Sequence, residues 1–200
     1  MSFGFEARDA AIDAALKKAE DNDVLLMAAA SNVGRDMVNA RSWPAASRDN
    51  VMCIYAAEGR GVPYPDNPRW RRDTHRLATL GVMVPVWSTS GDSAVSSITH
   101  RSGTSIATPA AAGLAACVLS FVWRSEGIYL SNMKAKHGRA NERFQNAKKR
   151  LLRASGMNEI FKRMADEDDN ADYHFVHPWK MFDQSTSTMT LIENIVNHLA

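Results

Sequence analysis

The sequence predicts an α/β fold of three layers, in which helices cover both faces of a mostly parallel sheet. Three observations predict this class. Two short apolar runs, residues 24–30 and 51–57, have the length and continuity of strands that are buried on both faces. An amphipathic segment precedes the first run, so helix and strand alternate as they do in parallel sheets. A longer apolar run, residues 105–123, predicts a helix buried in the core.

The first half of the chain supplies the sheet. Residues 6–21 carry apolar side chains at helical spacing with charges between them, which predicts an amphipathic helix. A loop, residues 33–50, separates the two buried strands. Residues 58–76 contain three prolines and five arginines and predict an exposed irregular loop. Residues 77–88 predict a short strand pair, and residues 90–102 predict a polar loop that leads to the core helix.

Eight lysines and arginines fall within residues 134–153. One interpretation is a nucleic-acid surface, and the other is a solvated amphipathic helix. We favour the helix because no aromatic residues interleave the charges. The residues expected to face inward are Phe144, Ala147, Leu151 and Leu152.

The C-terminal part of the chain predicts shorter elements. Apolar residues within 157–164 repeat at helical spacing and predict another short helix. Residues 173–179 predict a terminal strand that anchors to the domain. A polar linker and a short terminal helix, together residues 184–200, follow. The chain is therefore divided into a main domain, residues 1–183, and this linker with its helix.

Composition limits the partners and cofactors. Two hundred residues with 45% hydrophobic and 23% charged residues suit one globular domain, and a net charge of +2 gives no reason to invoke nucleic acid. No apolar run reaches the ~18 residues that span a bilayer, so no membrane partner is expected. The N-terminus lacks a basic, apolar leader, which favours an intracellular (cytoplasmic) location. Cys53 and Cys117 are expected to be free buried thiols, and no metal or cofactor is expected.

The segment of residues 103–113, Gly-Thr-Ser-Ile-Ala-Thr-Pro-Ala-Ala-Ala-Gly, places Ser105 between a glycine turn and the apolar helix. A helix N-terminus carries unpaired N–H groups and partial positive charge, so negative charge that develops near Ser105 is stabilised there. Attacking serines are commonly presented in this way. Taken alone, however, Gly-Thr-Ser before a helix is also an ordinary N-cap, and that alternative is the more frequent one.

A second motif favours the nucleophile over the ordinary N-cap. The strand 24–30 ends in Ser31-Asn32, and the carboxyl ends of parallel strands are where α/β proteins place their chemistry. The combination of Ala-Ala-Ser-Asn-x-Gly with Gly-Thr-Ser-x-Ala-Thr-Pro about seventy residues later closely resembles the subtilisin-like serine proteases, or subtilases. The resemblance implies that Ser105 is the nucleophile and that Asn32 donates to the oxyanion. It also implies a subtilisin-like fold and serine endopeptidase activity on peptide or protein substrates.

Other segments fit the same family, so that the resemblance covers residues 1–165. Residues 44–57 resemble the family's segment between the two motifs. Leu80-Gly81-Val82 resembles its Ala-Pro-Gly-Val, with leucine where proline is usual. The opening residues resemble the strand end that lines the substrate cleft. The substrate-binding residues that the resemblance implies are Ser2, Phe3, Gly4, Ala30, Ser31 and Thr104.

The family's aspartate and histidine motifs, Asp-Thr/Ser-Gly and His-Gly-Thr-His, do not occur in this sequence. The resemblance therefore implies that the chain begins inside the sheet, with the N-terminal strands absent. The missing N-terminal half of the peptidase domain would then be a partner. The residues Asp73, His75 and His100 are interpreted as solvated loop residues rather than triad members. The chain alone is therefore expected to be inactive as an endopeptidase.

Two alternatives of other classes stay open. The first is a catalytically inactive pseudoprotease that serves as an interaction module, which the missing aspartate and histidine favour. The second is an esterase-like hydrolase built on Ser105, with His100 as its base. The absence of a Gly-x-Ser-x-Gly elbow argues against the usual layout of that class.

Overall fold

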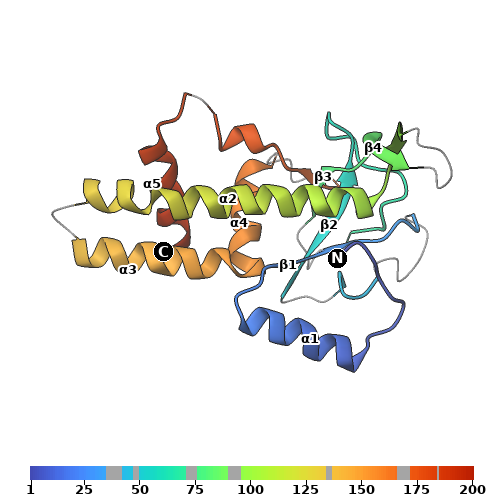
Figure 1. Ribbon diagram of the computed structural model, residues 1–200, viewed down its shortest axis with the longest axis horizontal. Helices are drawn as coiled ribbons and strands as arrows, with labels where there is room; N and C mark the ends of the chain where they lie inside the picture. Colours follow the sequence, from blue (N-terminus) through green and yellow to red (C-terminus); the bar gives the residue numbers. More distant parts are fainter. Residues whose placement is uncertain are drawn as a thin grey trace.

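A parallel sheet forms the centre of the computed structural model, which describes residues 1–34, 42–46, 50–70, 76–89, 96–133, 137–165, 172–183 and 185–200 (Figure 1). Its strands are β1 (Leu26–Ala29), β2 (Val51–Ala57), β3 (Leu77–Leu80) and β6 (His174–Phe175). They lie in the order β1-β2-β3-β6, and every neighbouring pair is parallel. The predicted strand at residues 51–57 is confirmed, and the strand predicted at 24–30 is four residues long.

Helices cover both faces of this sheet. Alternate residues of β2 point to opposite sides, and all seven are buried. Met52 and Ile54 join a core that includes α2 (Thr104–Asn132), whereas Cys53 and Tyr55 join a second core that includes Leu16 of α1 (Ala10–Asp21). The two helices thus lie on opposite sides of the sheet (Figure 1). The predicted three-layer α/β fold is confirmed.

The helix α1 begins where the sequence supplies a cap. The Asp9 carboxylate accepts hydrogen bonds from the N–H groups of Ala11 and Ile12 at 2.9 and 3.0 Å, which satisfies two of the donors that a helix leaves unpaired at its start. Leu16 is the buried residue of this helix. The helix is therefore shorter at its N-terminus than the predicted range of 6–21, because Asp9 fixes its first turn.

The core helix is longer and more exposed than the sequence predicts. It spans 29 residues, and within residues 107–119 the exposed positions outnumber the buried ones. The inward face packs against β1, β2 and β3, and the opposite face has no covering layer in the described part of the chain. Cys117 lies on the uncovered face and is exposed, so the prediction of a buried thiol is wrong there, whereas Cys53 is buried as predicted.

By length and composition α2 is also apolar enough to cross a membrane. Its most apolar window has a mean hydropathy of 1.8 and is 33% buried. The prediction counted only the apolar run that ends near residue 123, while the helix continues to Asn132. The packing of its inward face against three strands is that of a core helix.

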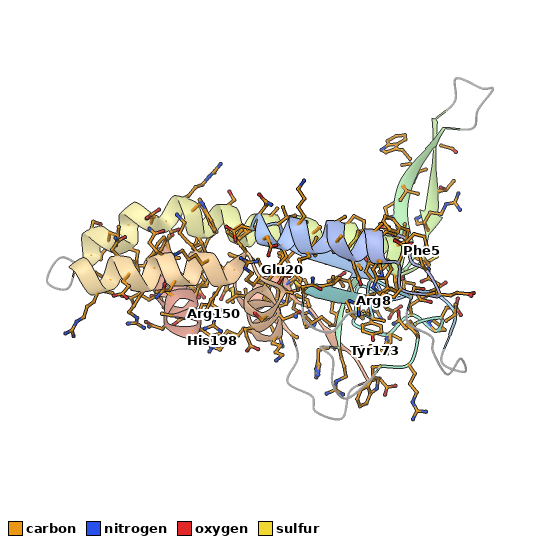
Figure 2. All side chains as sticks on the ribbon, turned by 90° about the horizontal axis from the view of Figure 1, so that it is seen from below. Phe5, Arg8, Glu20, Arg150, Tyr173 and His198 are labelled. Carbon is orange, nitrogen blue, oxygen red and sulfur yellow. The ribbon has the colours of Figure 1, made fainter. Side chains whose placement is uncertain are left out.

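A two-stranded antiparallel hairpin lies between β3 and α2 along the chain. It consists of β4 (Val84–Thr89) and β5 (Ser96–Arg101) and projects away from the rest of the molecule (Figure 2). The prediction of a polar loop over residues 90–102 missed β5. Its residues are mostly polar, with Ser97, Ile98 and His100 exposed, and lack the apolar alternation that marks a half-buried strand.

Three helices follow in the described C-terminal part of the chain; the first and third pack against the part of α2 that extends beyond the sheet, and the second packs on α3 and β2 (Figure 1). They are α3 (His137–Leu151), α4 (Ala154–Met164) and α5 (Thr188–Leu199), with a short 3₁₀ helix, Pro178–Lys180, before α5. The inward-facing residues of α3 are confirmed for Phe144, Ala147 and Leu151, while Leu152 follows the helix and is half-buried. The helix predicted at residues 157–164 is confirmed within α4.

The terminal helix α5 contributes five residues to the larger core. They are Leu191, Ile192, Ile195, Val196 and Leu199. Arg150 of α3 donates to the carbonyl oxygen of Leu199 at 2.9 Å, which fixes the C-terminal end of α5 on α3. Arg150 and His198 lie at this end of the molecule (Figure 2). The helix therefore stabilises the extended half of α2.

We expect Ile195→Ala to lower the free energy of unfolding by about 2–5 kcal/mol, because it leaves a cavity between α5 and its neighbours. Asn194→Ala, on the exposed side of the same helix, should change it by less than about 0.5 kcal/mol. Urea denaturation followed by circular dichroism measures both. Equal effects of the two variants would contradict the role of α5 in the core.

Candidate active site

Three chain segments converge where α2 begins. The end of β1 leads into Ser31 and Asn32, the end of β3 leads into Gly81, and the hairpin leads into Gly103. The N–H of Gly103 donates to the carbonyl oxygen of Gly81 at 2.8 Å. The structure therefore brings the two sequence motifs together at the carboxyl edge of the parallel sheet, where α/β proteins place their sites.

The side-chain amide of Asn32 is held in one orientation. Its Oδ1 accepts a hydrogen bond from the backbone N–H of Thr104 at 2.8 Å and lies 3.2 Å from the Thr104 hydroxyl. Because a backbone N–H can only donate, the amide atom that faces it must be the oxygen. The Nδ2 group, a donor, has no hydrogen-bond partner among the described residues and is available to a bound oxygen atom.

Thr104 connects the two motifs and is fully buried. Its hydroxyl oxygen accepts from the Ser31 N–H at 3.3 Å and lies 3.2 Å from the Ser31 carbonyl oxygen. The sequence resemblance implied substrate binding for this residue. The geometry gives Thr104 contacts that position Ser31 and Asn32, and its role in substrate binding stays a prediction.

Ser31 adopts a backbone conformation that only glycine reaches without strain. Its φ is +128°, and a residue with a side chain in this region costs about 1–3 kcal/mol. The two contacts with Thr104 hold the strained backbone in place. This turn directs the Asn32 side chain toward the start of α2.

Two glycines permit the close approach of these segments. A Cβ added to Gly103, whose φ is +138°, would lie 3.1 Å from both Oδ1 and Nδ2 of Asn32. A Cβ added to Gly81 would lie 2.7 Å from the Ala107 Cβ and 2.9 Å from the Gly103 carbonyl oxygen. Sequence reasoning gave Gly81 no such role. The available signal was a glycine directly after a predicted strand, which often marks close backbone approach.

Ser105 is the second residue of α2 and is half-buried. Its N–H has no acceptor within the helix, because the first four N–H groups of any helix lack one. Its hydroxyl donates to the Ser2 carbonyl oxygen at 3.2 Å, and the Ser2 hydroxyl donates to the Ser105 carbonyl oxygen at 3.1 Å. The N-terminal segment is therefore hydrogen-bonded directly to the candidate nucleophile.

The remaining predicted substrate-binding residues differ in their exposure to solvent. Phe3 is 55% exposed and packs edge to face on Phe5. Gly4 lies against Ser42, where a Cβ would lie 2.2 Å from the Ser42 Cβ. Ala30 is fully buried and bonded through its backbone to neighbouring segments.

The described residues include no base for Ser105. His100 is exposed on β5, opposite Pro85, and the Ser105 hydroxyl donates to a carbonyl oxygen instead. Asp73 and His75 lie outside the described residues. Burial lowers the pKa of the Met1 amino group, which donates to the Met27 carbonyl oxygen beside this site. Among the described residues no group of three or more potential ligands could hold a metal ion.

The geometry can stabilise an oxyanion. An amide donor of fixed orientation and an unpaired N–H at a helix N-terminus lie beside a half-buried serine. Donors that are fixed in advance stabilise developing negative charge without reorganising during the reaction.

Comparison with protein families gives a match to the model described as the subtilase family over residues 1–156. Among solved structures, the prenylagaramide maturation protease PagA matches 100% of this chain with a TM-score of 0.59 and 19% identity. The self-cleaved protease domain of PatA matches 96% with a TM-score of 0.60 and 20% identity. The patellamide maturation protease PatA matches 97% with a TM-score of 0.58 and 19% identity.

This chain spans about three fifths of the length of those proteases, namely 61%, 58% and 62% in the same order. No curated protein matches the sequence. At identities near 20% the structural similarity shows a shared fold, and the family match covers most of the chain.

We expect Thr104→Val to lower the free energy of unfolding by about 1–3 kcal/mol. Valine has nearly the same shape as threonine but no hydroxyl, so the substitution leaves the Ser31 N–H without its acceptor. Thr104→Ser keeps the hydroxyl and should lose less. Chemical denaturation measures both. If the serine variant lost as much as the valine variant, the methyl group rather than the hydroxyl would hold the site together.

We expect Ser31→Gly to raise the free energy of unfolding by about 1 kcal/mol, because relief of the backbone strain exceeds the entropic cost of glycine. Ser155→Gly, at an exposed position of α4, should lower it by several tenths of a kcal/mol. Thermal denaturation of both variants provides the measurement. A loss of stability in Ser31→Gly would show that the Ser31 side chain contributes more than its backbone strain costs.

Proposed function

Because the chain belongs to the subtilase family, we propose that it is the part of a serine endopeptidase domain that carries the nucleophile and the oxyanion site. Ser105 is the proposed nucleophile and Asn32 the proposed oxyanion donor. The observation that carries the proposal is the hydrogen bond from the Thr104 N–H to Asn32 Oδ1, since it leaves Nδ2 as a free donor beside Ser105. The family match over residues 1–156 supports the same assignment.

In the proposed reaction the Ser105 oxygen attacks the carbonyl carbon of a peptide bond. The hydroxyl proton passes to a general base, and the carbonyl oxygen becomes an oxyanion. Asn32 Nδ2 and the Ser105 N–H donate to that oxyanion, assisted by the positive end of the α2 dipole. The base then returns the proton to the leaving amine, and water hydrolyses the acyl-enzyme in the same manner.

The base belongs to a second polypeptide segment in this proposal. The family's aspartate and histidine motifs do not occur in this sequence, and a serine hydroxyl without a base is a weak nucleophile near neutral pH. The proteases with similar structures are longer than this chain, which leaves about two fifths of their length without a counterpart. We name the proposed polypeptide that supplies the aspartate and histidine the complementary segment.

The proposed substrate is a peptide or protein that binds along the N-terminal residues. Ser2 and Phe3 are exposed beside Ser105, and Ser2 is bonded to it. An extended peptide that lies along this segment brings a carbonyl group to the nucleophile. In this proposal the backbone of Ala30 and Ser31, which follow β1, forms the other side of the peptide-binding site.

A second candidate function is a catalytically inactive interaction module. The observation that favours it is the hydroxyl of Ser105, which donates to the Ser2 carbonyl oxygen rather than to a base. In this alternative the same surfaces bind a polypeptide without cleaving it.

We expect a fluorophosphonate probe to leave Ser105 unlabelled in the 200-residue chain and to label it once the complementary segment is present. That segment is sought as a reading frame upstream of the Met1 codon with Asp-Thr-Gly and His-Gly-Thr-His contexts, and is expressed together with this chain. Ser105→Ala should abolish both labelling and peptide hydrolysis. Asn32→Ala should lower turnover by about 10²–10³-fold, the effect of removing one oxyanion donor from a subtilisin-type site.

Ser131→Ala, an exposed serine at the far end of α2, is the control and should change neither signal. Labelling of Ser105 in the short chain would contradict the need for a second segment and would implicate His100 or His75 as the base. Absence of labelling in the combined protein would favour the inactive interaction module.

A further inference from the structure

A proline, Pro109, lies in the second turn of α2. Proline has no N–H, and its ring clashes with the carbonyl group four residues earlier in a helix, which here is the carbonyl of Ser105. The Ser105 carbonyl oxygen therefore lacks the donor that the helical pattern normally supplies. The structure provides another donor from a residue 103 positions away: the Ser2 hydroxyl donates to this oxygen at 3.1 Å.

We propose that Ser2 is a positioning residue for the nucleophile, because its hydroxyl replaces the donor that Pro109 lacks and thereby fixes the backbone of Ser105. The inference rests on the proposed function and adds a role to the substrate binding that the sequence predicts for Ser2. The carbonyl group of Ser105 and its hydroxymethyl group are attached to the same Cα atom. A carbonyl that is held in place therefore restricts the direction of both the Oγ atom and the N–H of this residue.

Hydroxyl groups also donate to other carbonyl groups around the proline. The Thr104 carbonyl oxygen accepts from the Thr108 hydroxyl at 2.8 Å, and the Ala107 carbonyl oxygen accepts from the Thr79 hydroxyl at 2.8 Å. Both of these donor residues are buried. Ser2 is exposed and belongs to the N-terminal segment rather than to the helix or the sheet. The bond to the nucleophile's carbonyl therefore depends on a segment that borders the proposed substrate site.

Backbone hydrogen bonds hold the N-terminal segment on both sides of Ser2. Before it, the Met1 carbonyl oxygen accepts from the Ala29 N–H at 3.0 Å. After it, Phe5 and Trp43 exchange two backbone hydrogen bonds of 2.8 and 2.9 Å. A side chain that positions a reacting group has to be held by its own neighbours. Ser2 meets this requirement because it lies between two fixed points of the chain.

A second hydrogen bond runs in the opposite direction between the same two residues. The Ser105 hydroxyl donates to the Ser2 carbonyl oxygen at 3.2 Å. This acceptor is a backbone atom, so it is present whatever side chain stands at position 2. Ser2→Ala therefore removes the proposed positioning contact and keeps the acceptor of the Ser105 hydroxyl.

Steady-state kinetics of the combined protein, which is this chain with the complementary segment, distinguish positioning from substrate binding. We expect Ser2→Ala to lower kcat for peptide hydrolysis about tenfold, because a small displacement of the nucleophile slows the chemical step. KM should change by less than about twofold, whereas loss of a contact that only binds substrate raises KM and leaves kcat unchanged. Ser2→Thr keeps the hydroxyl and should restore most of kcat.

Hydrogen exchange of the Thr104 N–H tests the contact in the chain alone, without any activity. This N–H is bonded to Asn32 Oδ1, so its exchange requires the start of α2 to open. We expect Ser2→Ala to speed the exchange about 2–5-fold, the effect of losing one exposed neutral hydrogen bond. The N–H of Val122, in the buried middle of the helix, should exchange at an unchanged rate. Nuclear magnetic resonance measures both rates.

Pro109→Ala tests the cause of the contact. Pro109 is exposed, so alanine leaves no cavity, and it supplies the N–H that the Ser105 carbonyl lacks. In this background Ser2→Ala should change the exchange of the Thr104 N–H by less than about 1.5-fold, because the two substitutions act on one carbonyl and are not additive. Ser131→Ala is the matched control, since its hydroxyl also donates to a carbonyl of α2, that of Ile128 at 2.9 Å. It should change neither exchange at the start of the helix nor kcat.

Four results would overturn the inference. Equal exchange of the Thr104 N–H in Ser2→Ala and in the unsubstituted chain would do so whether or not the combined protein is active. A raised KM with unchanged kcat would assign Ser2 to substrate binding alone and leave the proposed function intact. A full effect of Ser2→Ala in the Pro109→Ala background would exclude the missing proline N–H as its cause. Absence of Ser105 labelling in the unsubstituted combined protein would overturn the proposed function itself, and faster exchange in Ser2→Ala would then identify a purely structural contact.

Discussion

The hydrogen bond from the Thr104 N–H to Asn32 Oδ1 joins the two motifs that carry the proposed nucleophile and the proposed oxyanion donor. Residues more than seventy positions apart meet there, and the contact requires two glycines that let the segments approach. Gly103 leaves room for the Asn32 amide, and Gly81 leaves room for the start of α2 against the sheet. A side chain at either glycine would move the helix start away from the strand end. The position of the start of α2 against the strand ends is thus fixed at the same place as the proposed site.

The helix α2 is held in this position by contacts along its whole length. Its first half packs on three strands, and its second half is surrounded by α3 and α5. A helix of 29 residues has a length of about 44 Å at 1.5 Å per residue, so the sheet alone cannot support it. The aromatic pair Tyr129 and Phe144, with ring centroids 5.3 Å apart, anchors the far end to α3. The C-terminal helices therefore stabilise the element whose first turn holds Ser105.

Sequence patterns predicted the elements whose periodicity reflects their surroundings. The strand at 51–57 is continuous and apolar because both its faces are covered, and α4 shows its buried side as a repeat of Met157, Ile160, Phe161 and Met164. The strand β5 was missed because an exposed hairpin imposes no apolar alternation. The burial of α2 was overestimated for a related reason: a helix that is apolar on every side carries no information about which side is covered. The contact of Gly81 with α2 depends on tertiary geometry that no local pattern encodes.

The proposed oxyanion donors are positioned by contacts within the described part of this chain. The Thr104 N–H holds the Asn32 amide in one orientation, and the first turn of α2 positions the N–H of Ser105. Donors placed in advance need no reorganisation when negative charge develops. The proposed reaction further requires a base at the Ser105 hydroxyl, and this hydroxyl donates to the Ser2 carbonyl oxygen in the structure. That hydrogen bond therefore has to break before a base can accept the proton, which makes the position of the N-terminal segment part of the proposed chemistry.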